Sequence, residues 1–141
     1  MTPKKFSTHW KSSVQPRKQH KFRHNAPLHV RQKLVHIHLS PELRKKYGTR
    51  AAQAHKGDRV KVLRGKFKKQ EGKIEKVDLK RERIFIAGLE YTKKNGNKVP
   101  ISFRPSNLMI TVLEMADKRR KLGKEKIKEK IKSKSSEESK K

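Results

Sequence analysis

Lysine and arginine carry most of the chemistry that this chain offers, and their number decides which class of ligand it can bind. The sequence holds 41 Lys and Arg against 13 Asp and Glu, which gives a formal net charge of +28 at pH 7. Such a charge favours a phosphate backbone, because each cation that neutralises a phosphate releases condensed counterions. A histone-like DNA-binding protein would share this preference, so charge alone predicts a polyanion as partner and leaves the choice of RNA or DNA open.

The segment 56–77, KGDRVKVLRGKFKKQEGKIEKV, has the most specific pattern. Gly65 and Gly72 bound a loop that carries three lysines (Lys66, Lys68 and Lys69) around one aromatic residue, Phe67. Glycine lets a backbone approach a ligand closely, and the lysines indicate that this ligand is negative. Phe67 could stack on a base or fill the open end of a barrel, and the second interpretation is favoured.

Catalytic and metal chemistry find little support in the sequence. There is no cysteine, and the seven histidines are scattered; His36 and His38 are two residues apart but far from any pair of carboxylates. The acidic residues between 57 and 113 each lie within three residues of a Lys or Arg, and no nucleophile–base pair or phosphate-binding loop stands out. We therefore expect no enzyme activity, no catalytic residue, no metal site, no cofactor and no small-molecule substrate.

No part of the chain predicts membrane insertion. No apolar run approaches the ~18–20 residues that a spanning helix needs. The start, MTPKKFSTHWKSS, has no apolar block after its lysines and does not resemble a secretory signal. We expect a soluble protein of the cytoplasm.

The elements that would position the loop are short strands. Between residues 57 and 113 the β-forming residues alternate at period two, as in Val60/Val62, Val99/Ile101/Phe103 and Leu108/Ile110/Val112. Glycines and the Asn95-Gly96 pair separate these runs, and Asn-Gly predicts a hairpin whose central positions both have positive φ. The pattern predicts a mainly β fold: a small SH3-like barrel of five strands over residues 56–113.

Two short helices are expected before the barrel, in the segment 25–55. Asn25 is a candidate cap for a helix that enters through Pro27 and runs along LHVRQKL. Ser40 can cap the second helix, with Pro41 at its first position and Gly48 at its end. Neither helix has a wide apolar face, so both need the barrel or RNA to hold them.

The two ends are basic and differ in pattern. Residues 1–24 contain seven Lys and Arg and no acid, which predicts an extended basic arm that becomes ordered on a polyanion. Residues 114–141 contain twelve Lys and Arg with six acids and have helix-forming stretches, so we expect a basic, partly helical tail. Whether this tail is solvated or contacts RNA is left open. The last residues, 133–141, are typical of disorder.

Basic charge is spread along the whole chain. The blocks 1–24, 25–56, 57–113 and 114–141 carry net charges of +7, +6, +9 and +6. A DNA-binding tail would concentrate its charge at one end. An even distribution favours a protein that is surrounded by RNA helices.

Residues 56–77 resemble the KOW motif of ribosomal proteins and transcription elongation factors. The flanking segments HKFRHNAPLHVRQKL (20–34), LSPELRKKYGTR (39–50) and RPSNLMI (104–110) occur in one order with it. Together they resemble the large-subunit ribosomal protein family numbered twenty-four in bacteria and twenty-six in eukaryotes, in its archaeal form. An elongation module would share the barrel but lack these flanks.

The resemblance spans about residues 15–120 and implies several properties. They are binding to the 5′ region of large-subunit ribosomal RNA, an early role in subunit assembly, a place near the exit of the peptide tunnel, and neighbouring ribosomal proteins as partners. Two positions depart from the family pattern: Lys69 stands where glycine is usual, and Arg104 where histidine commonly precedes Pro-Ser-Asn. If position 69 needs a positive φ, Lys69 is strained.

Charge pattern and resemblance together select fifteen candidate RNA-binding residues. They are Arg17, Lys18, Lys21, Arg23, His24, Arg31, Lys33, Arg64, Lys66, Lys68, Lys69, Lys73, Arg104, Ser106 and Asn107. Arg17, Lys18, Lys21 and Arg23 are expected on phosphates along the extended arm.

Overall fold

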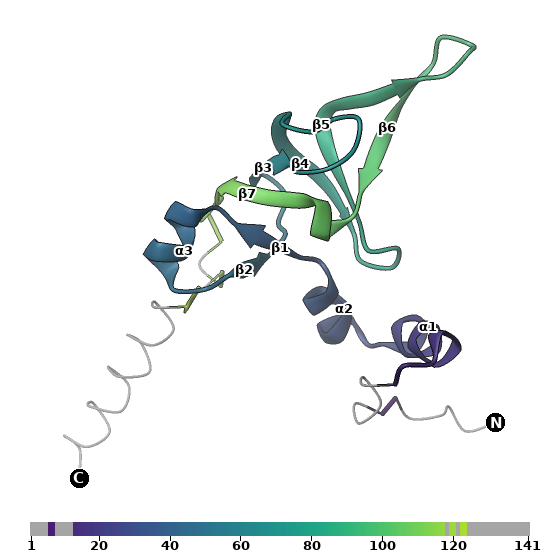
Figure 1. Ribbon diagram of the computed structural model, residues 1–141, viewed down its shortest axis with the longest axis vertical. Coiled ribbons are helices and arrows are strands. Elements are labelled where there is room, and N and C mark those ends of the chain that lie inside the picture. The colour runs from purple at the N-terminus through teal and green to yellow at the C-terminus, as the bar shows by residue number, and fades with distance from the viewer. Residues whose placement is uncertain (1–5, 8–12, 118, 121, 124–141) are drawn as a thin grey trace.

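A seven-stranded sheet forms the body of the protein in the computed structural model, which describes residues 6–7, 13–117, 119–120 and 122–123 (Figure 1). The strands are β1 (His36–Leu39), β2 (Ala51–Gln53), β3 (Arg59–Val62), β4 (Glu71–Asp78), β5 (Arg83–Thr92), β6 (Lys98–Phe103) and β7 (Leu108–Val112). The helices are α1 (Pro16–Asn25), α2 (Leu28–Leu34), α3 (Pro41–Tyr47) and the short 3₁₀ turn η1 (Pro105–Asn107). The prediction of a mainly β, small barrel-like domain is confirmed, and five of the strands lie within residues 56–113.

The strands follow the order β2-β1-β7-β3-β4-β5-β6. Strands β1 and β2 lie in the segment for which only helices were predicted, so the barrel-like sheet does not start at residue 56. β1 pairs in parallel with β7, with His38 opposite Met109 and Leu39 opposite Ile110. The parallel pairing with β7 joins residues about 70 positions apart and is not visible in a local pattern.

The hydrophobic core consists of the alternating aliphatic residues from which the strands were predicted. Aliphatic side chains at every second position are at most 1% exposed in β1, β3, the first half of β5 and β7: Ile37, Leu39, Val60, Val62, Ile84, Ile86, Leu108 and Ile110. Gly72 of β4 lies directly under β5, where an added Cβ would come within 2.5 Å of the Ile86 side chain. The close packing of β4 on β5 therefore requires glycine at this position.

Helices α2 and α3 occur where the sequence predicted them. The Ser40 hydroxyl accepts a hydrogen bond from the Leu43 N–H at 3.4 Å, and Gly48 ends α3 with φ 68°. The cap expected at Asn25 is wrong, because Pro27 precedes the first residue of α2 and no side chain caps this helix.

The N-terminal arm is helical rather than extended from residue 16 to residue 25, so the prediction that residues 15–24 of the basic arm are extended is wrong. Residues 16–25 form α1, which starts with Pro16 at its first turn and has no buried residue. Arg, Lys and Gln favour helix, and Pro16 has the φ that a first turn needs. Residues 1–5 and 8–12 lie outside the described part.

The Asn95-Gly96 hairpin joins β5 to β6 by a different turn from the one expected. Only Gly96 has a positive φ, of 80°. The Gly96 N–H donates to the Lys93 carbonyl and the Lys93 N–H to the Asn97 carbonyl, both at 2.9 Å. This is a three-residue loop in which the left-handed glycine follows a turn, so Asn95 does not need a positive φ.

The start of the C-terminal tail packs on the sheet rather than standing in solvent. Arg120 is 7% exposed and Asp58 is fully buried, and the Arg120 Nη2 donates to the Asp58 Oδ2 at 2.7 Å. Residues 118, 121 and 124–141 lie outside the described part, so most of the predicted tail is not tested. Within the described residues, no helix is long and apolar enough to cross a membrane.

Candidate nucleic-acid interface

A groove of about 650 Å³ lies between α1, β1, the β4–β5 turn and η1. We call it the basic groove. Its lining is His20, Arg23, His24, Leu34, His36, His38, Lys80, Arg81, Glu82, Arg83, Arg104, Pro105 and Ser106. The contributing segments are far apart in the sequence, so the groove exists only in the folded chain.

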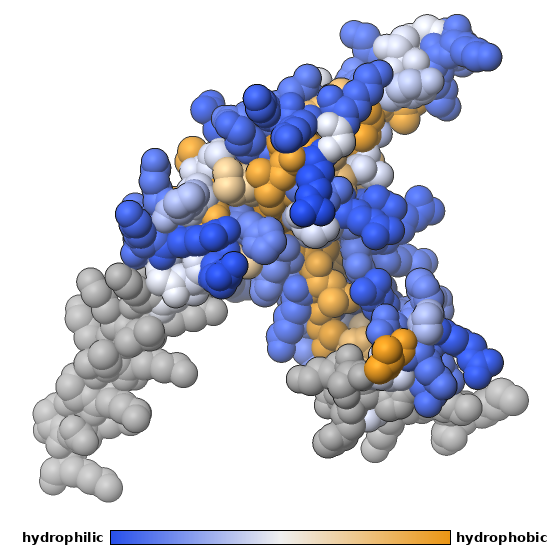
Figure 2. Space-filling view, viewed as in Figure 1, coloured by the Kyte–Doolittle hydropathy of each residue, from blue (hydrophilic) through white to orange (hydrophobic). Residues whose placement is uncertain are grey.

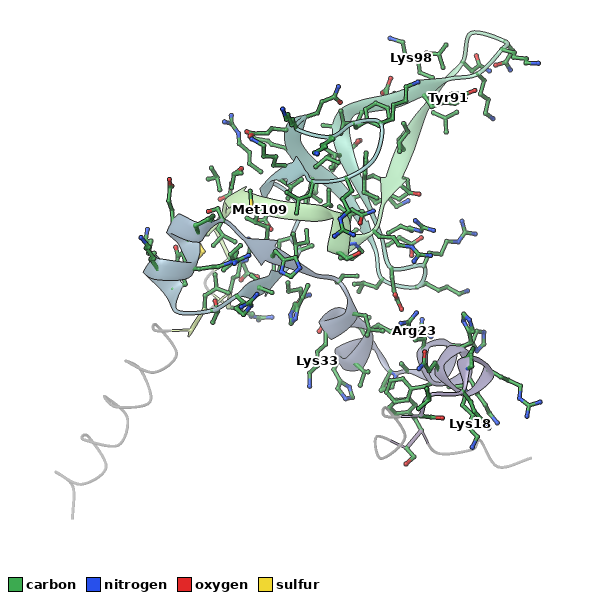
Figure 3. The ribbon with its side chains drawn as sticks, viewed as in Figure 1. Lys18, Arg23, Lys33, Tyr91, Lys98 and Met109 are labelled. Carbon is green, nitrogen blue, oxygen red and sulfur yellow. The ribbon has the colours of Figure 1, made fainter. Side chains whose placement is uncertain are left out.

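Helix α1 presents one face to the groove. His20, Arg23 and His24 follow the i, i+3, i+4 spacing that places side chains on one side of a helix. The Nη2 of Arg31, on α2, donates to the His24 carbonyl oxygen at 2.5 Å and so ties the end of α1 to the next helix. Figure 3 shows Arg23 on the side of α1 near the β-sheet, while Lys18 lies toward the far end of that helix.

Strand β1 contributes its solvent-facing side. His36 and His38 are exposed, whereas Ile37 and Leu39 between and after them are fully buried. Alternate residues of a strand point to opposite faces. Burial of the two aliphatic side chains in the core therefore directs both imidazoles outward, into the groove.

The backbone of the β4–β5 turn is held by hydrogen bonds to the Asp78 carboxylate. The Asp78 Oδ1 accepts from the N–H groups of Lys80 and Arg81, each at 3.0 Å. Glu82 has a φ of 54°, a conformation that is uncommon outside glycine and closes the turn tightly. These contacts fix the backbone below Lys80 and Arg81, whose exposed side chains are left to the groove.

The segment Arg104–Asn107 is anchored at both ends. Pro105 is buried, and the Asn107 carbonyl accepts the Leu63 N–H at 2.8 Å. Arg104 and Ser106 remain exposed at the groove. The anchored 3₁₀ turn thus places Arg104 without burying its guanidinium.

The charge of the groove is strongly unbalanced. Its lining includes five cations (Arg23, Lys80, Arg81, Arg83 and Arg104) and one carboxylate, Glu82. The Arg23 Nε lies 3.9 Å from the Glu82 Oε1, and none of the other four forms a salt bridge among the described residues. Guanidinium groups match phosphate oxygens with paired hydrogen bonds, so the groove suits a phosphate backbone.

The lysine loop, residues 64–70, is a second cationic surface. The Lys69 N–H donates to the Val62 carbonyl at 2.9 Å and the Gln70 N–H to the Phe67 carbonyl at 3.1 Å, and the lysines of the loop are exposed. Phe67 is half-buried against the core and meets Phe103 edge-on, with ring centroids 6.1 Å apart. This geometry supports the interpretation that Phe67 fills the end of the barrel.

Lys69 adopts the conformation that was expected to strain it. Its φ is 72°, in the left-handed region that favours glycine. The chain thus keeps the backbone of a glycine position while placing a cation there.

The structure gathers some of the predicted residues and separates others. The basic groove holds Arg23, His24, Arg104 and Ser106, and the lysine loop holds Arg64, Lys66, Lys68 and Lys69. Outside both lie Arg17, Lys18 and Lys21 on α1, Arg31 and Lys33 on α2, Lys73 on β4, and Asn107.

Six basic or histidine residues of the groove were not predicted from the sequence: His20, His36, His38, Lys80, Arg81 and Arg83. A signal existed for some of them. The run VHIHL alternates apolar and polar residues as a strand does, and KRER follows a strand as a basic turn. Among the described residues, no group of three or more His, Asp or Glu is arranged to hold a metal ion.

A small β-barrel with a basic groove and a lysine-rich loop between β3 and β4 defines a nucleic-acid-binding protein of the KOW type. The family of ribosomal proteins called L26 in eukaryotes and L24 in archaea matches residues 13–130. The chain belongs to this family. It is similar to the "Large ribosomal subunit protein uL24" of Methanothrix thermoacetophila and of Methanosarcina barkeri. Each is 53% identical over 108 residues, which cover 77% of this chain and 93% of the relative.

Proposed function

We propose that this chain is a structural, non-enzymatic constituent of the large ribosomal subunit and that it binds large-subunit ribosomal RNA through the basic groove and the lysine loop. The relatives that it matches are named as large-subunit proteins, and they align with most of its length. The order of the flanking motifs extends the proposal to the 5′ region of the RNA, to an assembly role, and to a place near the peptide tunnel exit in cytoplasmic ribosomes.

One observation carries the proposal for the groove: five cations from three separate parts of the fold line one cavity with a single carboxylate. Cations that repel each other are brought together here by packing that does not neutralise them. A bound polyanion would remove this repulsion, which gives the RNA-bound form an advantage over the free form.

The two surfaces are joined through the backbone. The N–H of Leu63, the residue before the lysine loop, donates to the carbonyl oxygen of Asn107, three residues after Arg104 of the groove. Phe67 of the loop packs against Phe103, the residue before Arg104. An RNA strand that contacts both surfaces would therefore meet a rigid spacing between them, which favours a folded RNA over an arbitrary polyanion.

The test compares two charge changes of equal size. R83Q/R104Q removes two groove cations, and R50Q/K56Q removes two exposed cations that line neither the groove nor the loop. Binding to in vitro transcribed large-subunit RNA is measured against salt. The groove variant should lower the slope of log affinity against log salt by about 1.4, from ~0.7 per single-strand phosphate contact. The control should leave it nearly unchanged.

Equal slopes for both variants would show that binding is diffuse and that the groove has no special role. A DNA duplex of matched length serves as competitor. If DNA displaces the RNA at equal concentration, the ligand is any polyanion, and the ribosomal role loses its support.

A further inference from the structure

The far end of the β5–β6 hairpin stands away from the rest of the protein. Figure 1 shows the outer ends of β5 and β6 projecting past the other strands of the sheet as a two-stranded ribbon. Residues 90–100 are all exposed. We call this segment the hairpin tip. It shares no residue with the basic groove or the lysine loop.

A β-bulge controls which side chains point along the core face of the tip. In the first half of β5 the buried residues are even-numbered, Ile84 and Ile86. Beyond the bulge the buried residue is odd-numbered, Leu89. The pairing register of β5 with β6 shifts between Phe85 and Glu90. Because side chains alternate along a strand, Tyr91 lies on the same face as Leu89, two residues further out.

The core face thus continues past the edge of the barrel and becomes exposed. Tyr91 pairs across the strands with Val99, and these side chains are 57% and 36% exposed. Directly opposed residues point to the same face. Tyr91 and Val99 therefore form a small apolar step with the tyrosine ring uncovered, next to the buried Leu89.

The charges around this step favour RNA over a protein as its occupant. The tip carries Lys93, Lys94 and Lys98, with Glu90 as its only acid. None of the three lysines forms a salt bridge within the described residues. Figure 3 shows Tyr91 and Lys98 together on the ribbon, and Figure 2 shows mainly hydrophilic side chains over this end of the molecule. An aromatic ring among unpaired cations is the arrangement that binds single-stranded nucleic acid.

We propose that the hairpin tip is a separate RNA-binding element, in which Tyr91 stacks on an unpaired base and the three lysines bind the neighbouring phosphates. The inference takes ribosomal RNA as the ligand and so rests on the proposed function, but it assigns a surface that the groove and loop do not include. Bases inside a duplex have no free face for the ring, so the target is a loop, bulge or strand end.

The stability of the tip agrees with this role. A two-stranded ribbon without a third strand is only marginally stable in water. Stacking of Tyr91 on a base would cover the step and fix the ribbon, with Val99 supporting the back of the ring. The β-bulge shifts the alternation of side chains along β5. Without this shift Tyr91 would lie on the opposite face of the ribbon.

The first experiment measures affinity for in vitro transcribed large-subunit RNA with the full chain. Y91A should weaken binding about five- to 150-fold, the range for loss of one stacked base, without changing the salt slope. Y91F, which keeps the ring, should bind like the wild type. K93Q/K94Q/K98Q should lower the salt slope by about 2, from ~0.7 per contact. All these positions are exposed, so the melting temperature should not move.

The second experiment identifies the occupant. Tyr91→p-benzoylphenylalanine is incorporated into reconstituted large subunits and irradiated. An adduct with ribosomal RNA supports the proposal. An adduct with a protein, or no adduct together with unchanged affinity for Y91A, overturns it. Failure is distinguishable from failure of the proposed function, because R83Q/R104Q would still lower the salt slope if only the hairpin tip is wrongly assigned.

Discussion

Arg120 and Arg104 place the same type of side chain in two opposite environments, one buried and one exposed. Arg120 is 7% exposed, and both of its Nη atoms donate hydrogen bonds: they reach both carboxylate oxygens of Asp58 and the carbonyl oxygens of Gln53 and Glu114. Arg104 is exposed at the basic groove and forms no salt bridge within the described residues.

The difference follows from the cost of removing a charge from water. A buried guanidinium needs a partner for its charge and for its N–H groups, since the desolvation cost is several kcal/mol or more (~20 in an idealised medium). An exposed guanidinium keeps its water and is not required to pair. In a chain of net charge +28, cations without internal partners are therefore left at the surface, where RNA can pair with them.

The largest expected effect is on the buried pair. R120A leaves the Asp58 carboxylate buried beside the His55 and Glu114 N–H groups only. The free energy of unfolding should fall by about 3–5 kcal/mol, as for other broken buried pairs. R119A, an exposed neighbour, is the control in denaturant unfolding. A loss below about 1 kcal/mol for R120A would mean that the pair is solvated and the contrast with the groove is false.

The next effect is on binding rather than on stability. K66A/K68A/K69A should reduce the salt slope of RNA binding by about 2, from ~0.7 per single-strand contact, and leave the fold intact. K61Q is a useful control, because the Lys61 ammonium already has a partner, the Glu71 Oε1 at 3.0 Å. If K61Q changes the slope as much per charge as the triple variant, an existing salt bridge does not decide which cations bind RNA.

A smaller effect is expected at Lys69, where backbone strain and charge oppose each other. K69G should raise the free energy of unfolding by about 1 kcal/mol, because a left-handed non-glycine residue costs ~1–2 kcal/mol and glycine returns part of that as lost chain entropy. K69A removes the same ammonium but keeps a Cβ, so it should not stabilise. Equal stability of the two variants would exclude strain at φ 72°.

The smallest effect is a pH dependence at His55. Burial of the ring, and next the positive charge of Arg120, lower the pKa of His55 below its ordinary value of 6.5, while Asp58 and Asp117 oppose the shift. The unfolded chain therefore binds the proton more readily, and the histidine contributes a loss of stability as pH falls below 6.5. H55Q should flatten the stability curve between about pH 7.5 and 5.5 in thermal unfolding. An unchanged slope would show that His55 titrates alike in both states.

Local patterns predicted more of the fold than of the site. The alternation of Val60/Val62 and of Leu108/Ile110 was enough to place strands, since one face of each had to be buried. Ser40 with Pro41 was enough to place the start of α3. By contrast, the extended arm was wrong, because charge excludes burial but does not choose between an extended chain and an exposed helix.

The sequence by itself determined the class of ligand, the strands between residues 56 and 113 and the lysine loop, because charge, alternation and glycine spacing act over a few residues. Only the tertiary structure decided which cations share a site and which are paired internally. Arg119 and Arg120 are adjacent in the sequence and both basic, yet only Arg120 reaches Asp58, 62 residues away. Burial and partnership depend on the three-dimensional path of the chain, and the energy of a charge depends on both.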